Sequence, residues 1–145
     1  MYKHILICTD GSNVGDKAVE QGLEIAKLAK AKVTAVKVTE MWSALDVAGR
    51  DGLARIEHYE RVAAEAASKT LQAVAIDAKR VGVECDTVHV PDSHPAEGIL
   101  ATATARGCDL IVMGSHGRRG LDRLLMGSQA NNVLNQAKVP VLVCR

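Results

Sequence analysis

Short apolar runs alternate with longer amphipathic stretches along this chain. The runs are rich in Val, Ile and Leu and are bounded by Gly, Pro, Asp or Ser, a pattern typical of buried strands. They predict five strands, at residues 4–8, 33–38, 83–90, 109–113 and 139–144.

The stretches between these runs repeat their apolar residues every three or four positions, which predicts helices. The predicted helices span residues 13–30, 53–81, 95–105 and 128–136. Strict alternation of apolar strands with helices requires a parallel sheet covered on both faces, and right-handed crossovers then give an open, doubly wound α/β fold. With no linker, repeat or low-complexity tract, residues 1–145 are expected to form one domain.

Composition and charge narrow the classes of function. The chain has 145 residues, of which 48% are hydrophobic and 24% charged, so a disordered or collagen-like chain is excluded. Its 18 Lys and Arg against 17 Asp and Glu leave a formal charge of +1, which argues against a nucleic-acid or anionic-membrane partner. Aromatic residues make up 2%, too few for a platform on which bases stack.

The cellular compartment is predicted from what the chain lacks. No apolar window is long enough for a membrane helix, and the first apolar run is too short for a signal peptide. The four cysteines are widely spaced, with no Cys-x-x-Cys pair, and sit in or beside apolar runs. We therefore expect a cytoplasmic protein whose cysteines are small buried hydrophobic residues.

Candidate chemistry lies directly after the first and fourth predicted strands, where open parallel sheets bind ligands. Thr9-Asp10-Gly11-Ser12 follows the first strand, and a glycine-rich stretch from Gly114 to Gly127 follows the fourth. In the second segment Gly114-x2-Gly117-x9-Gly127 leads into Ser128, where we expect a helix N-cap. Glycines allow positive φ and close approach to a ligand, and the following helix start offers free amides, so the segment predicts a phosphate cradle.

This pattern is neither a Walker loop nor the Gly-x-Gly-x-x-Gly dinucleotide motif. By spacing alone, phosphate binding and simple turn formation are equally open. Asp10 is either a ligand contact or the acceptor of an Asx turn, with Ser12 or Asn13 capping the next helix. His116 is either a loop residue or a general base, but no nucleophile or paired carboxylate stands at a fixed offset from it.

The motifs together resemble the universal stress protein family, over essentially the whole chain. The resemblance is carried by Cys8-Thr9-Asp10-Gly11-Ser12, by the run from Asp109 to Gly117, by Gly127-Ser128 and by Val139-Pro140-Val141-Leu142-Val143. The glycine spacing is similar to that of the ATP-binding subgroup. The resemblance implies a five-stranded parallel sheet of order 3-2-1-4-5, an adenine nucleotide alpha hydrolase-like fold, and a nucleotide-binding module active in the stress response.

The resemblance also implies a set of nucleotide-binding residues. It places Asp10 near ribose and adenine, the backbone of Thr9 and Val38 around adenine, and the backbone of Gln129 and Ala130 at the phosphates. The full set is Thr9, Asp10, Val38, Met113, Gly114, His116, Gly117, Gly127, Ser128, Gln129 and Ala130. Family members often carry a hydroxyl residue where this chain has Ala130, so one phosphate contact is expected to be missing. The implied ligand is ATP, or AMP or ADP, with Mg²⁺ held through the nucleotide and by no protein metal site.

The last predicted strand favours association of the chain with a second copy of itself. In the implied order it forms a sheet edge, and from Val139 to Cys144 it is apolar and poorly protected, since Pro140 removes a single donor. An antiparallel homodimer through this edge follows, and the resemblance implies the same. Other partner proteins are not identified, and neither a nucleic acid nor a membrane is expected.

Several alternatives remain open from the sequence. One alternative is a metal site made by Cys85, His89 and His94, but a metal site needs more ligands than these. Arg118, Arg119 and Arg123 either assist the phosphates or face solvent. Met41 and Trp42, in the long irregular stretch 39–51, either close over the base or pack on the following helix. The chain is expected not to be an enzyme; the alternatives are a slow ATPase or phosphotransferase, and a dimeric module without nucleotide.

Overall fold

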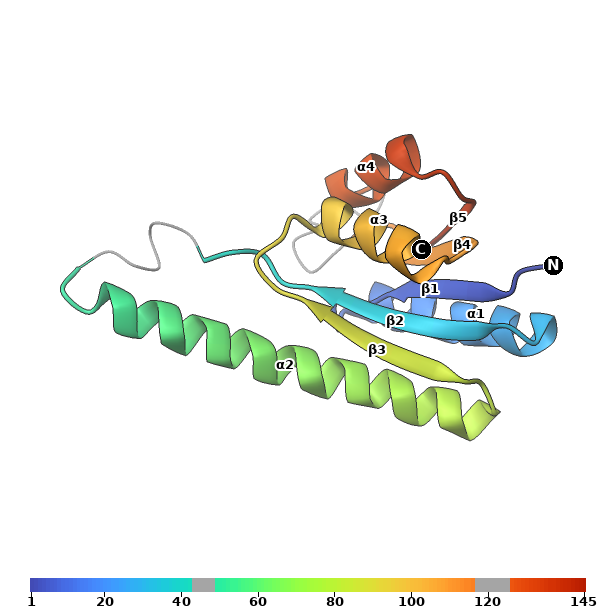
Figure 1. Ribbon diagram of the computed structural model, residues 1–145, viewed down its shortest axis with the longest axis horizontal. Coiled ribbons are helices and arrows are strands. Elements are labelled where there is room, and N and C mark those ends of the chain that lie inside the picture. Colours follow the sequence, from blue (N-terminus) through green and yellow to red (C-terminus); the bar gives the residue numbers. More distant parts are fainter. Residues whose placement is uncertain (43–48, 117–125) are drawn as a thin grey trace.

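The computed structural model describes residues 1–42, 49–116 and 126–145 (Figure 1). Within them one parallel sheet has the strand order β3-β2-β1-β4-β5. The strands are β1 (His4–Cys8), β2 (Lys32–Val38), β3 (Cys85–Val90), β4 (Leu110–Gly114) and β5 (Val141–Cys144). The helices are α1 (Asn13–Ala29), α2 (Gly52–Val81), α3 (Pro95–Arg106) and α4 (Ser128–Gln136). The predicted α/β fold and strand order are confirmed.

The sheet is covered on both faces, and the alternation of side chains along each strand divides the core in two. Ile5 and Ile7 of β1 pack with buried residues of α1 and α2. Leu6 points to the opposite face and packs with Ile99 of α3 and Val133 of α4. Because β1 is buried along its whole length, it reads in the sequence as a continuous apolar run.

Three strands begin later than predicted, each for a local reason. β5 starts after Pro140, which has no N–H to donate to the ladder. β3 starts after Val83, whose amide bonds to the carbonyl of Ala78 and so completes the end of α2. β4 starts after Asp109, whose carboxylate accepts the amides of Lys3 at 2.9 Å and His4 at 3.1 Å.

The long helix α2 extends well beyond the sheet (Figure 1). Its 30 residues span about 45 Å, against about 23 Å for the seven residues of β2. Its buried residues, from Ala67 to Ala78, all lie in its second half, whereas Leu53 and Val62 are exposed. The apolar face expected along the whole helix is therefore packed in the core only after Ala66.

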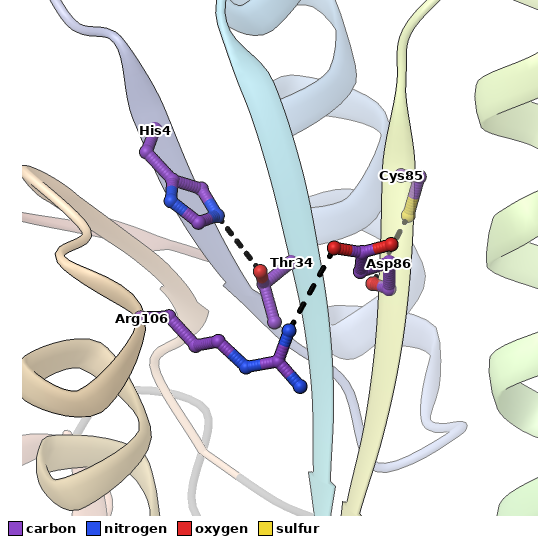
Figure 2. A network of polar contacts seen from close by, with 5 residues as sticks. All are labelled: His4, Thr34, Cys85, Asp86 and Arg106. Atoms are coloured by element: carbon purple, nitrogen blue, oxygen red, sulfur yellow. Dashed lines mark hydrogen bonds and ion pairs between the residues drawn. The ribbon is translucent and has the colours of Figure 1, made fainter.

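The amino ends of the strands, at the opposite edge from the predicted site, are joined by a polar network (Figure 2). The buried His4 ring lies 2.8 Å from the Thr34 hydroxyl, measured from Nε2 to Oγ1. Arg106 at the end of α3 pairs with Asp86 of β3 at 3.7 Å. The first contact links β1 to β2, and the second links the end of α3 to β3.

The cysteines behave largely as expected. Cys8, Cys108 and Cys144 are buried and Cys85 is half-buried, and all four are free thiols. None of the helices in the described part of the chain is both long and apolar enough to cross a bilayer.

Candidate functional site

The candidate site lies where the strand order reverses. β1 and β4 are neighbours in the sheet, with Ile5 opposite Leu110 and Ile7 opposite Val112. From β1 the chain turns to α1 on one face, while β4 leads towards α4 on the other. Such a divergence opens a crevice beyond the carboxyl ends of the two strands.

A cavity of about 620 Å³ occupies this crevice. Its walls include every predicted site residue that the structure describes, whereas Gly117 lies outside the described residues, as do Arg118, Arg119 and Arg123. These predicted residues are Thr9, Asp10, Val38, Met113, Gly114, His116, Gly127, Ser128, Gln129 and Ala130. The predicted site residues that the structure describes therefore line a single cavity.

The turn between β1 and α1 fixes the Asp10 carboxylate. Its Oδ1 accepts the amide of Ser12 at 2.9 Å and the hydroxyl of Ser12 at 2.5 Å, so the Asx turn considered from the sequence is present. Ser12 is the N-cap of α1, and its Oγ accepts the amide of Gly15 at 3.1 Å. Gly11 has a φ of 78°, which favours glycine. Asp10 also lines the cavity, so the turn and a ligand role are compatible.

Close packing of the chain on itself explains two of the motif glycines. Neither Gly114 nor Gly127 has a positive φ, so the conformational role expected for them is wrong at these positions. A Cβ on Gly114 would stand 2.8 Å from Cγ1 of Val14, and one on Gly127 would stand 3.1 Å from Cα of His116. The Gly127 amide donates to the carbonyl of Ser115 at 2.6 Å. The two glycines bring α1, β4 and the start of α4 together at the cavity.

The helix α4 starts at Ser128 as predicted, but its N-cap lies one residue earlier than predicted. Gly127 is the N-cap of α4, and Ser128 is the first helical residue, so the capping role predicted for Ser128 is wrong. The reason is that Gly127 is extended while its carbonyl accepts the first helical bond, from Asn131 at 3.0 Å. Within the described residues, the amides of Ser128, Gln129 and Ala130 have no hydrogen-bond acceptor, as expected of a first turn.

One wall of the cavity was missed by sequence analysis. It comes from α2 and consists of Tyr59, Ala63 and Ala66. The Tyr59 hydroxyl donates to the carbonyl of Glu40 at 3.0 Å, joining α2 to the chain that leaves β2. A sequence signal existed, because Tyr59 is one of three aromatic residues in the chain.

A lysine was also missed. Lys37 of β2 lines the cavity, and its Nζ donates to the carbonyl of Asp10 at 3.0 Å. In register with Lys37 on β3 lies His89, whose Nε2 is 2.8 Å from the Thr39 hydroxyl. Burial lowers the pKa of His89, and Lys37 lowers it further. The lysine at the cavity wall is therefore backed by an imidazole outside the lining, and the neutral form of that imidazole is favoured.

Nucleophilic and metal chemistry have little support here. Cys8 lines the cavity, but burial raises the pKa of its thiol far above the ordinary value, so the thiolate is disfavoured. The His116 Nδ1 lies 3.0 Å from the hydroxyl of Ser115. Across the described residues there is no group of three His, Cys, Asp or Glu side chains that could hold a metal ion. Met41 and Trp42 are not among the lining residues.

A second, larger groove of about 940 Å³ runs between α1 and α2. Its walls carry opposite charges, including Glu20 and Glu24 of α1 and Lys69 and Arg80 of α2. Thr9 lines both this groove and the smaller cavity. Among the described residues, none from the glycine-rich segment after β4 or from α4 lines this groove, so the smaller cavity is the better candidate site.

Comparison with known proteins shows the family to which a chain with this fold and cavity belongs. The model of the universal stress protein family matches residues 1–145. The chain belongs to the universal stress protein family. Universal stress protein MJ0531 of Methanocaldococcus jannaschii is 36% identical over 148 residues, which cover 100% of this chain and 83% of that protein.

Solved universal stress protein structures share the fold. The hypothetical protein MJ0577 of Methanocaldococcus jannaschii superposes with a TM-score of 0.84 at 27% identity, covering 99% of this chain and 96% of that one. A universal stress protein in complex with cAMP superposes with a TM-score of 0.69 at 24% identity, covering 98% and 95%. The second likeness, at 24% identity, establishes the fold alone.

Proposed function

We propose that this universal stress protein binds an adenine nucleotide, in the first place ATP, and acts as a regulatory module in the stress response. Residues 1–145 act as one cytoplasmic domain that pairs with a second copy through β5. The observation that carries the proposal is the cavity at the ends of β1 and β4, which is lined both by apolar side chains and by first-turn residues of α4 whose amides have no acceptor in the described part of the chain. A bound cAMP in a protein of the same fold is compatible with it.

The lining of the cavity suits the different parts of a nucleotide. Val38, Ile99 and Met113 provide an apolar surface for a base. The first turn of α4 provides main-chain donors and the positive end of a helix dipole for phosphates. Asp10 lines the same cavity, and its carboxylate can accept ribose hydroxyls. The volume of about 620 Å³ lies in the range of small-molecule sites, roughly 300–1,000 Å³.

A slow ATPase is the second candidate, favoured by two carboxylates at the cavity, Asp10 and Glu40. Efficient phosphoryl transfer needs a held metal and a group that orients the nucleophile. Asp10 already accepts two bonds from Ser12 through Oδ1. We therefore expect binding without significant turnover, and phosphate release under single-turnover conditions would show the opposite.

Calorimetric titration with ATP, ADP, AMP and adenosine, each with and without Mg²⁺, tests the proposal. A ligand at 100 times its Kd stabilises the fold by about 2.7 kcal/mol, which corresponds to several degrees of Tm for a domain of this size. Nucleotide that copurifies with the protein would be direct support. A protein that shows neither heat nor a Tm shift with any of these ligands would exclude the function.

A further inference from the structure

The side chain of Gln129 in α4 reaches across to α3. Its Oε1 accepts the amide of Ala96, in the first turn of α3, at 3.1 Å. The N-cap of α3, His94, makes no side-chain cap bond, and Pro95 has no N–H. Gln129 thus supplies from a second helix the cap that α3 lacks in its own sequence.

This contact fixes which way the carboxamide faces. A main-chain N–H can bond only to an acceptor, so the oxygen of Gln129 must point to Ala96 and the NH₂ group must point elsewhere. In the described part of the chain, Nε2 makes no hydrogen bond, and no side-chain nitrogen or oxygen is both buried and unpaired. The NH₂ group is therefore accessible, on a half-buried residue that lines the cavity.

We propose that the Gln129 NH₂ group donates to a phosphate of the bound nucleotide and makes the site select nucleoside phosphates over nucleosides. The inference rests on the proposed function and adds a side chain to the main-chain donors of α4. Gln129 sits one residue after Ser128, which lines the same cavity and whose amide has no acceptor among the described residues. Through its oxygen the same side chain couples the phosphate end of the site to the start of α3.

Gln129→Glu separates the two roles of this side chain. A glutamate of the same length keeps an oxygen for the Ala96 amide, and its charge suits the helix N-terminus, so Tm should be unchanged or higher. The NH₂ group is lost and an anion takes its place beside the phosphates. Because a hydrogen bond to a charged group is lost and repulsion is added, ATP affinity should fall at least about tenfold.

Two controls accompany Gln129→Glu. Adenosine is the control ligand, and Gln136→Glu is the control variant. Adenosine has no phosphate, so the 129 variant should bind it as tightly as the wild type does. Gln136 is exposed at the far end of α4, so the same change of charge there should leave ATP affinity intact. Raising the ionic strength should narrow the ATP deficit of Gln129→Glu, since screening weakens the repulsion.

The outcomes separate this inference from the function on which it rests. Wild-type-like ATP binding by Gln129→Glu overturns the phosphate contact while leaving nucleotide binding in place. An equal loss of ATP and adenosine affinity also overturns it, because the effect would then not depend on phosphate. If the wild-type protein binds neither ligand, the proposed function itself fails. Gln129→Met, which removes both cap and donor, should lower Tm by about 2–4 °C as well as weakening ATP binding.

Discussion

Gly15 and Asp10 are packed so closely that no side chain fits between them: a Cβ on Gly15 would stand 2.7 Å from Oδ1 of Asp10. The carboxylate cannot simply withdraw, because the same oxygen accepts the amide and the hydroxyl of Ser12. Gly15 therefore determines where the carboxylate at the cavity can lie, although it has an ordinary helical position in α1.

Gly15→Ala should displace the Asp10 carboxylate and weaken ATP binding by about tenfold, the effect of losing a hydrogen bond to a charged group. Alanine is a better helix former than glycine by about 1 kcal/mol, which offsets part of the strain, so the free energy of unfolding should change little. Calorimetry and urea unfolding measure the two effects. Gln21→Ala, on the exposed side of α1, is the control. Undiminished affinity in Gly15→Ala would show that the position of Asp10 is unimportant.

Tyr59→Phe tests the cavity wall that comes from α2. The substitution keeps the ring against the cavity and removes the hydroxyl that donates to the Glu40 carbonyl. A neutral hydrogen bond contributes about 0.5–1.5 kcal/mol, so nucleotide affinity should fall between about twofold and tenfold if the tether holds the wall in place. Val62→Ala, on the exposed face of α2, should leave affinity unchanged. Equal affinity in Tyr59→Phe and wild type would show that the tether does not shape the site.

The fold could be predicted because each strand and helix is indicated by the residues within it and at its ends. The strands of a doubly covered parallel sheet are apolar throughout, and glycine or proline marks their ends. The same logic located the site, since residues such as Asp10 and Gly114, which lie at or just beyond the carboxyl ends of neighbouring strands, must meet at one edge. The four-residue strand β5 shows the limit of this approach, because the apolar run is longer than the segment that can join the ladder.

Contacts between distant segments could not be predicted. The wall formed by Tyr59 and Ala63 depends on how far α2 extends past the sheet, and periodicity reports only which residues share a face. The link from Gln129 to Ala96 depends on two helices meeting at their N-termini. The one-residue error at Ser128 arose because Gly127 takes the extended cap conformation itself.

Stability at mildly acidic pH should depend on His4. Burial of this ring lowers its pKa below the ordinary value of 6.5, and the nearby charge of Lys32 lowers it further, whereas the Arg106 carbonyl, Asp109 and Asp86 act in the opposite direction. The unfolded chain therefore takes up the proton first as the pH falls. The contribution of His4 to the free energy of unfolding is therefore complete above about pH 6.5. It decreases as the pH falls below this value, until His4 is protonated in the folded state as well.

Urea unfolding at pH 7.5 and pH 5.5 measures this loss. His4→Gln should be less stable than wild type at pH 7.5, since the contact with Thr34 is disturbed, but should lose less stability on acidification. The pKa of His89 is lowered in the same direction, so part of the pH dependence should remain in the variant. His58→Gln, on the exposed surface of α2, controls for the removal of a histidine. An unchanged acid loss in His4→Gln would contradict the assignment.

β5 lies at an edge of the sheet, where we predict that two copies of the chain pair. The carbonyls of Pro140 and Cys144 accept amides of the chain in and after β4, from Ile111 at 3.0 Å and Ser115 at 2.7 Å. Since successive residues of a strand direct their backbone groups to opposite sides, Val141 and Val143 present theirs to the open edge. Val143 packs partly against the core of its own chain, so its backbone is the part that it offers to a second copy.

Val143→Pro should convert the dimer to a monomer without unfolding the domain. Proline removes an N–H that points away from β4, so the existing ladder is kept, while antiparallel pairing with a second β5 loses a donor and meets the ring. Leu142→Pro is the contrasting variant, because it removes a donor that faces β4 and should lower Tm. Sedimentation velocity at micromolar concentration distinguishes the states. A monomeric wild type, or a Val143→Pro protein that stays dimeric, would show that copies do not pair through this edge.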